Sequence, residues 1–151
     1  MEMAAITKIK LKIKKILVPL DGSKNSIRGL EEAIYLARQC DAIITGLCVI
    51  PFYIPLTGPK FLGPYRKHMK KQATDFMNEA KTLAAKHGIV FRGKIVKGDV
   101  MTDDINNFAT SRGFDLIVIA SRGFGQVKGW FLGSVTNALV HKSTVPVLVV
   151  K

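Results

Sequence analysis

The sequence predicts an α/β fold, a single domain with an open, Rossmann-like parallel sheet of five strands and helices on both faces. Short apolar stretches rich in β-branched residues alternate with amphipathic stretches along the chain. This alternation is typical of a parallel sheet that helices cover on both sides. The chain has 151 residues, of which 48% are hydrophobic, which suits one domain with a substantial core.

The first part of the chain predicts a strand, a helix and a second strand. The apolar run Lys14–Leu20 (KKILVPL) indicates a buried strand, and the letters DGS after it indicate a turn into a helix. Apolar residues at three- and four-residue steps predict this helix over Lys24–Gln39, with Ser23 as its N-cap. The β-branched stretch Ala42–Ile50 predicts the second strand.

The middle of the chain predicts a loop, a long helix and a third strand. Four prolines between Pro51 and Pro64 indicate the loop. An amphipathic pattern from Met69 to Ala84 predicts the helix, which Gly88 should end. The stretch Ile89–Asp99 predicts the third strand.

Two further helices and two further strands complete the pattern. A short helix is expected over Thr102–Arg112, a strand over Asp115–Ala120, a helix over Ser134–Lys142 and a last strand over Val145–Val150. In such sheets, ligands bind beyond the carboxyl ends of the strands, where the strand order reverses. If the first and fourth strands are neighbours, the turns that follow them frame one crevice.

The loop after the fourth strand, Ala120–Ser134 (ASRGFGQVKGWFLGS), contains four glycines and leads into a helix. Glycine lets backbone amides approach a ligand closely, and a helix N-terminus offers N–H groups that attract anions, most often phosphate. The hydroxyls of Ser134 and Thr136 could add contacts. The pattern is neither GxxxxGK[ST] nor a GxGxxG after the first strand. The alternative is a long βα turn without a ligand.

The chain resembles the universal stress protein family over almost its full length. The stretches KKILVPLDGS, VKGDV, ASRGFGQVKGWFLGS and TVPVLVV carry this resemblance. The ATP-binding members of the family carry G-x2-G-x9-G-[ST]. Here Gly123, Gly133 and Ser134 keep that spacing, and Ala120 stands at the first glycine. The resemblance divides the chain into a basic N-terminal extension, residues 1–13, and a universal stress protein domain, residues 14–151.

The resemblance implies a fold like that of the adenine nucleotide alpha hydrolases and a homodimer paired through the last strand. It also implies a regulatory protein of the stress response that binds ATP, with ADP or AMP as alternatives and Mg²⁺ held through the phosphates. By matching position, the resemblance places the adenine and ribose beside Pro19, Leu20 and Asp21, with Val49 at the end of the second strand. It places Ile119 and Ala120 beside the ribose. The residues that it places around the phosphates are Gly123, Gly133, Ser134, Val135 and Thr136.

Several of these residues have a second interpretation. Asp21 could bind the ligand or help Ser23 to cap the first helix. If the backbone at Ala120 has a negative φ, alanine fits without cost, whereas a positive φ would cost about 1 kcal/mol. Arg122 and Lys128 could neutralise phosphate or be solvated. Trp130 and Phe131 are expected to pack the loop down or to meet a partner subunit.

No catalytic constellation is visible, so the sequence favours a binding protein over an enzyme. His141 lies two helical turns beyond Ser134, roughly 10 Å along the axis, which is too far for direct contact with the phosphates. The alternatives are an enzyme that hydrolyses ATP slowly and a basic interaction protein of the same fold without a nucleotide. Cys40 and Cys48 form no CxxC motif, and we expect reduced thiols and no zinc site.

The net charge of +12 attracts polyanions by counterion release, but the lysines look spread along the chain. The tail Lys8–Lys14 alternates lysine with apolar residues. It lacks the aromatic residues on which single-stranded bases stack, so a basic extension is favoured and nucleic-acid binding is not expected. No export signal and no apolar run of about 20 residues is visible, which predicts a cytoplasmic protein.

Overall fold

A computed structural model describes residues 12–51, 62–124 and 132–151. Strands and helices alternate through these ranges as the sequence predicts, and the boundaries mostly agree within two residues. The elements are β1 (Lys15–Pro19), α1 (Lys24–Cys40), β2 (Ile43–Pro51), α2 (Leu62–Lys86), β3 (Phe91–Gly98), α3 (Met101–Ser111), β4 (Leu116–Ala120), α4 (Ser134–Lys142) and β5 (Val147–Val150).

The five strands form one parallel sheet in the order β3-β2-β1-β4-β5. Ile16 in β1 is in register with Ile44 of β2 on one side and with Leu116 of β4 on the other. The chain therefore runs outward from β1 to β3 and then crosses back to β4 and β5. The strand order reverses between β1 and β4, so these strands are the expected neighbours and the predicted fold class is confirmed.

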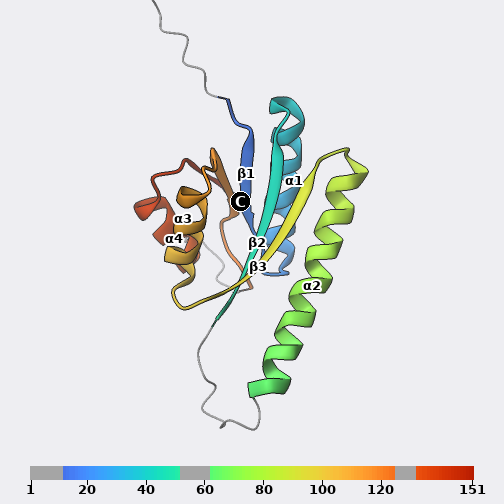
Figure 1. Ribbon diagram of the computed structural model, residues 1–151. Coiled ribbons are helices and arrows are strands. Elements are labelled where there is room, and N and C mark those ends of the chain that lie inside the picture. Colours follow the sequence, from blue (N-terminus) through green and yellow to red (C-terminus); the bar gives the residue numbers. More distant parts are fainter. Residues whose placement is uncertain (1–11, 52–61, 125–131) are drawn as a thin grey trace, which may run out of the picture.

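The helices cover both faces of the sheet, with α1 and α2 on one side and α3 and α4 on the other (Figure 1). Side chains alternate between the two faces along β1. Ile16 and Val18 are fully buried in the core beneath α1 and α2, whereas Leu17 is fully buried against Ile117 of β4 and Leu139 of α4. A strand that is buried on both faces needs apolar residues at every position, which explains the continuous apolar run in the sequence.

Three helix ends follow the expected chemistry, and the end of α1 differs from it. The Ser23 hydroxyl accepts a hydrogen bond of 3.1 Å from the Ser26 amide, which confirms Ser23 as the N-cap of α1. Gly88 and Gly113 adopt the left-handed conformation after α2 and α3, with φ of 70° and 65°. After α1 the same conformation falls on Asp41, with φ of 54°, because no glycine follows this helix and Asp tolerates the left-handed region.

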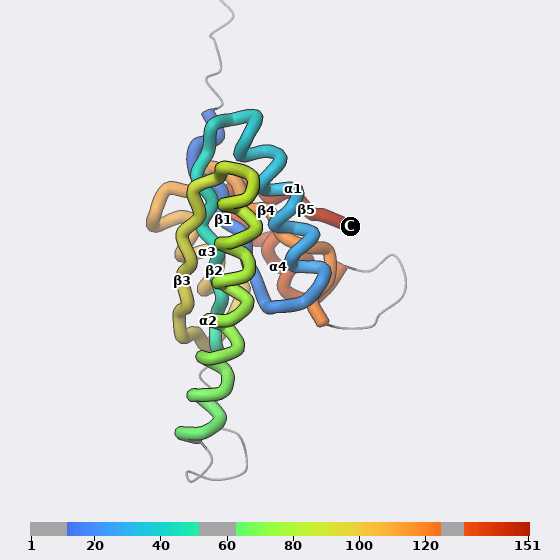
Figure 2. The backbone as a smooth tube through the Cα atoms, turned by 90° about the vertical axis from the view of Figure 1, so that its right-hand side faces the viewer, coloured from blue at the N-terminus to red at the C-terminus, as the bar shows by residue number. Residues whose placement is uncertain are grey.

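The helix α2 begins at Leu62, seven residues before the predicted start at Met69. Figure 2 shows that its first turns project beyond the sheet. Residues 63–68 are exposed, so they carry no apolar stripe from which a helix could be predicted. Pro64 is tolerated there because it lies in the first turn, where the amides have no partner within the helix.

The structure also bears on the predictions for the cysteines, the N-terminal extension, the proline-rich loop and membrane helices. Cys40 and Cys48 are both free thiols, as expected. Most of the basic N-terminal extension and most of the proline-rich loop lie outside the described residues. Within the described ranges, no helix has the length and hydrophobicity that crossing a membrane requires.

Candidate functional site

A cavity of about 940 Å³ lies at the carboxyl ends of β1, β2 and β4, where the strand order reverses. The turn after β1, the end of β2, the end of β4 with the glycine loop, and the start of α4 all border it. The eleven residues that the sequence suggests for a site all line this one cavity. They are Pro19, Leu20, Asp21, Val49, Ile119, Ala120, Gly123, Gly133, Ser134, Val135 and Thr136.

The turn between β1 and α1 is shaped by Asp21. Its Oδ1 atom accepts a 2.9 Å hydrogen bond from the Ser23 amide. A Cβ atom at Gly123 would lie 2.5 Å from Asp21 Oδ2, so this second oxygen lies against the glycine loop. Ser23, and not Asp21, caps the helix. The Asp21 carboxylate thus orders the turn with one oxygen and meets the loop after β4 with the other.

The described ends of the glycine loop are fixed by backbone and side-chain hydrogen bonds. The Gly133 amide donates to the Ser121 carbonyl at 2.7 Å, and the Ser121 amide donates to the Val150 carbonyl at 2.7 Å. Asn25 in the first turn of α1 donates from Nδ2 to the Gly123 carbonyl at 3.1 Å. Asn25 could not be singled out from the sequence, because its contact with the loop depends on the adjacency of β1 and β4.

Lys128, Trp130 and Phe131 lie between Phe124 and Leu132, outside the described residues. The alternative roles of these three residues therefore stay predictions.

The N-terminus of α4 is directed at the cavity. Gly133 is its N-cap and offers no side-chain hydrogen bond. The amides of Ser134, Val135 and Thr136 are in the first turn, where no carbonyl one turn earlier can accept from them. These three residues line the cavity, and the partial positive charge of the helix end lies in the same place. The arrangement is suited to binding an anion.

The Thr136 side chain corrects one expectation. The sequence suggested its hydroxyl as a phosphate contact, but Thr136 is buried and its Oγ1 donates to the Ala120 carbonyl at 2.7 Å. This bond ties α4 to the last residue of β4. The hydroxyl is therefore a structural group, and the Thr136 amide is the part that is available to a ligand.

The backbone conformation at Gly123 and Gly133 does not require glycine, because φ is not positive at either residue. In the described residues, positive φ among glycines is confined to Gly22, Gly88 and Gly113. A Cβ atom at Gly133 would meet its nearest neighbour, the Ser121 carbonyl oxygen, at an ordinary 3.4 Å. Ala120 also has no positive φ, so alanine fits there without backbone strain. Instead, the missing side chain at Gly123 makes room for the Asp21 carboxylate, since a Cβ atom there would lie 2.5 Å from Asp21 Oδ2.

The other end of the cavity is largely apolar. Met69 and Phe76 of α2 face Met101 and Ile105 of α3 across the end of β2, where Val49 lies. The α2 and α3 residues were not among the candidates from the sequence. Met69 and Phe76 are seven residues apart and share one helix face, but the same spacing describes an ordinary core stripe, so the sequence could not separate the two.

Cys48 also lines this cavity and is 7% exposed. Burial, and after it the nearby Asp21 carboxylate, raises the pKa of the Cys48 thiol to about 11. The thiol is therefore neutral at physiological pH. Neutral Cys48 adds to the apolar lining and is a poor nucleophile.

We expect the alkylation rate of Cys48 to rise about tenfold per pH unit between pH 8 and 10, because only the thiolate reacts and the pKa lies near 11. Iodoacetamide labelling of the Cys40→Ser variant measures this rate for Cys48 alone. A plateau near pH 9 would contradict the prediction.

A raised thiol pKa also means that the native state keeps its proton to a higher pH than the unfolded state does. The free energy of unfolding should therefore fall between about pH 9 and 11.

The fold and the site define a class of protein, the open parallel α/β proteins with a cavity where the strand order reverses. In this chain the cavity combines the N-terminus of α4 with an apolar part lined by α2, α3 and the end of β2, which we call the apolar slot. The model of the universal stress protein family matches residues 12–151. The chain belongs to this family.

Relatives of known sequence support this membership. Universal stress protein YxiE of Bacillus subtilis is 33% identical over 146 residues, and the match covers 91% of this chain and 98% of that protein. The solved structure of the universal stress protein UspA from Lactobacillus plantarum superimposes with a TM-score of 0.81 at 23% identity, covering 93% of this chain and 99% of that one.

Two similar structures contain nucleotides. A universal stress protein from Archaeoglobus fulgidus in complex with dAMP has a TM-score of 0.72 at 24% identity, covering 93% of this chain and 99% of that one. A universal stress protein in complex with cAMP has a TM-score of 0.73 at 21% identity, covering 93% and 98%. These similarities show that the fold is shared.

Proposed function

We propose that this protein is a regulatory adenine-nucleotide-binding protein whose ligand is ATP. The observation that carries the proposal is the shared cavity, in which the first-turn amides of α4 and the side-chain-free Gly123 and Gly133 meet an apolar slot. Phosphates suit the amides, and a flat apolar base suits the slot. The complexes of related proteins with dAMP and cAMP support an adenine ligand.

The proposed ligand would lie across the carboxyl ends of the strands. The base would occupy the slot near Val49, with Pro19 and Leu20 beneath it, and the ribose would pass Ile119 and Ala120. The phosphates would accept hydrogen bonds from the amides of Ser134, Val135 and Thr136, the three residues that begin α4.

We assign any Mg²⁺ to the phosphates of the nucleotide, because no group of three His, Cys, Asp or Glu side chains in the described ranges could hold a metal ion. Asp21 is the carboxylate of the β1–α1 turn that lines the same cavity.

The proposed assembly is a homodimer that pairs β5 with its copy in a second subunit. β5 lies at one end of the sheet order, and Leu148 in it is 39% exposed. An apolar edge strand of this kind is normally covered, and a second copy of the same strand would cover it. A monomeric mass by light scattering at micromolar concentration would count against this assembly.

Ala120→Gly is expected to bind ATP at least as tightly as the unmodified protein. Ala120 lines the cavity without backbone strain, so its methyl group only narrows the space beside the ribose. Removing it should gain up to about tenfold in affinity, which corresponds to 1.4 kcal/mol. Isothermal titration of both proteins with ATP measures the difference, and GTP is the matched ligand control.

A large loss of ATP affinity in Ala120→Gly would contradict the proposed position of the ribose. Equal binding of ATP and GTP would contradict adenine recognition in the slot. If neither nucleotide binds, the chain has the fold of the family without this ligand.

Two other functions remain distinguishable by experiment. An enzyme of the same fold would release ADP from Mg-ATP faster than about 0.1 s⁻¹, although typical enzymes are faster still. We favour a binding protein because His141 lies at the far end of α4 from Ser134. A basic interaction protein without nucleotide would show salt-dependent binding to polyanions alone.

A further inference from the structure

The positive charge of the protein is concentrated at one edge of the molecule. The segment 62–98, which forms α2 and β3, contains nine lysine and arginine residues and only two carboxylates. It therefore carries a net +7 of the total +12. β3 is one of the two edge strands of the sheet, and α2 packs beside it.

The cations of α2 gather on one side of the helix. At 100° per residue, five of them fall within an arc of about 140°, and we call these five residues the basic stripe. The basic stripe consists of Arg66, Lys67, Lys70, Lys71 and Lys81. Thr74 and Asn78 lie within the same arc. Together with Lys81, they line a groove of about 270 Å³ against β3.

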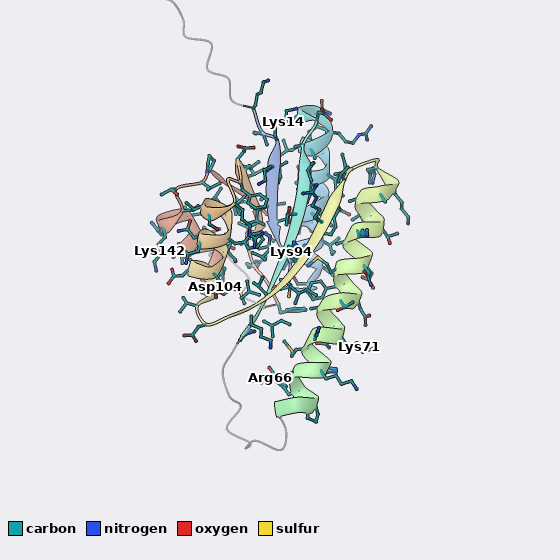
Figure 3. The ribbon with its side chains drawn as sticks, viewed as in Figure 1. Lys14, Arg66, Lys71, Lys94, Asp104 and Lys142 are labelled. Carbon is teal, nitrogen blue, oxygen red and sulfur yellow. The ribbon has the colours of Figure 1, made fainter. Side chains whose placement is uncertain are left out.

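The edge strand β3 carries two further exposed cations, Arg92 and Lys94. These two residues alternate along the strand with Phe91, Gly93 and Ile95, which line the groove beside α2. Their side chains therefore point to the opposite face of the sheet. In Figure 3, Arg66 and Lys71 lie on the part of α2 that projects beyond the sheet, and Lys94 lies on the sheet. The basic stripe is therefore the continuous row of cations on the α2 side of the sheet.

The basic stripe is separate from the nucleotide cavity. The residues of α2 that line the cavity include Met69, Gln72, Phe76 and Glu79. By the same helical geometry, they lie on the opposite side of α2 from the stripe. A ligand in the cavity therefore leaves the stripe accessible.

Among the residues that the structure describes, no carboxylate forms an ion pair with the stripe. All five residues are exposed. The ion pairs of Lys14 with Asp41 and of Lys142 with Asp103 do not involve the stripe. Like charges placed along one helix face repel one another, so a bound polyanion would stabilise this arrangement.

We propose that the basic stripe binds the phosphate backbone of double-helical nucleic acid without reading its sequence. From Arg66 to Lys81, the stripe is about 22 Å long at 1.5 Å per residue. This length matches about six base pairs at 3.4 Å each. Counterion release from the phosphates supplies the affinity.

The alternatives to a double helix fit this face less well. Single-stranded binders stack bases on aromatic side chains, but the exposed aromatic residue of α2, Tyr65, lies on the cavity side of the helix. Helices that lie in a membrane interface carry large apolar residues on the face opposite their basic residues. On α2 that opposite face is turned to the cavity, which Met69 and Phe76 line.

The sequence alone pointed away from nucleic acid, because its lysines look scattered and the N-terminal tail lacks aromatic residues. The fold changes this view, because α2 and β3 bring separate lysines and arginines to one edge of the molecule.

The test is a fluorescence anisotropy titration of the full chain with a labelled 20-base-pair DNA duplex of mixed sequence, at several salt concentrations. The stripe variant is Lys67→Gln/Lys71→Gln/Lys81→Gln. The control variant, Lys24→Gln/Arg38→Gln/Lys142→Gln, removes three cations elsewhere and has the same net charge. Thermal unfolding verifies that both variants fold.

The unmodified protein should bind with micromolar affinity and lose it steeply as salt rises. The stripe variant should bind about 10- to 100-fold more weakly, with a salt slope smaller by about two to three, since each phosphate contact in a duplex contributes about 0.9. The control variant should lose less than about threefold.

Three results would overturn the proposal. Equal losses in both variants would show that only the net charge acts, and an unchanged stripe variant would place the binding elsewhere, for example on the N-terminal tail. Binding to vesicles of phosphatidylcholine and phosphatidylserine, lost in the stripe variant and without any duplex binding, would identify a membrane surface instead.

Discussion

Replacing Gly123 by valine should weaken ATP binding at least tenfold while leaving the free energy of unfolding nearly unchanged. A Cβ atom at this position would lie 2.5 Å from Asp21 Oδ2. The larger valine side chain would displace the carboxylate and strain the 3.1 Å bond from Asn25 to the Gly123 carbonyl. Both changes occur in the lining of the cavity, where the proposed phosphates need space, and outside the two hydrophobic cores.

A graded series separates this steric effect from a general effect of removing glycine. Gly123→Ala should lie between the unmodified protein and Gly123→Val, because the atom it meets is the end of a movable side chain. Gly63→Ala is the matched control, since no atom lies within 4 Å of the added Cβ. Isothermal titration measures the ATP affinity of each variant, and urea unfolding measures its stability.

Unchanged ATP affinity in Gly123→Val would contradict the role of the glycine loop in the site. A loss of affinity that is accompanied by a large loss of stability would show instead that Gly123 is needed for folding. Only the combination of weak binding with a stable fold supports a ligand that approaches the backbone at this residue.

Much of the fold could be predicted because it depends on local patterns. Strands that are buried on both faces read as apolar runs, and helices read as stripes at three- and four-residue steps. The turn after β1 and the loop after β4 could be placed at one edge because parallel strands point the same way. The first turns of α2 were missed because residues 63–68 are exposed, so no apolar pattern indicated them.

The candidate site could be predicted only where its residues follow strand ends. Asn25 was missed because its bond to the Gly123 carbonyl joins residues that are 98 positions apart. The sequence suggests the Thr136 hydroxyl as one that could contact phosphate, because it does not show that the Ala120 carbonyl lies 2.7 Å from this hydroxyl. Both depend on which elements are neighbours, which a single sequence does not report.

Two glycines within strands show that neighbours in the core, too, cannot be identified from a single sequence. Gly46 of β2 is in register with Gly93 of β3, and together they leave a hollow beside the sheet. Met77 of α2 and Phe91 of β3 fill it: a Cβ at Gly46 would be 2.4 Å from the Phe91 Cζ atom, and one at Gly93 would be 2.5 Å from the Met77 Cγ atom. A glycine inside a strand indicates a close approach, but only the register reveals the partner.

Gly46→Ala is therefore expected to destabilise the protein by about 1 to 3 kcal/mol, the usual cost of overpacking a core. The added methyl group would also lie 3.0 Å from the Leu20 Cδ1 atom. Leu20 lines the cavity, so ATP affinity should fall as well. Thermal unfolding should show a lower midpoint, by about 2 to 4 °C per kcal/mol for a chain of this size. Gly63→Ala should stay within about 0.5 kcal/mol of the unmodified protein.

A double-mutant cycle identifies the atom responsible. Phe91→Leu removes the ring atom that the new methyl group would meet, at the cost of a small void. If the contact with Phe91 causes the loss, Gly46→Ala/Phe91→Leu should be more stable than the sum of the single changes predicts, by about 0.5 to 3 kcal/mol. Strict additivity would instead attribute the loss of stability to Leu20 and Met77, whose nearest atoms would lie 3.0 Å from the added Cβ atom. Because Leu20 is shared by the core and the cavity, recovery of ATP affinity in the double variant would further indicate that packing at Gly46 holds the floor of the nucleotide site in place.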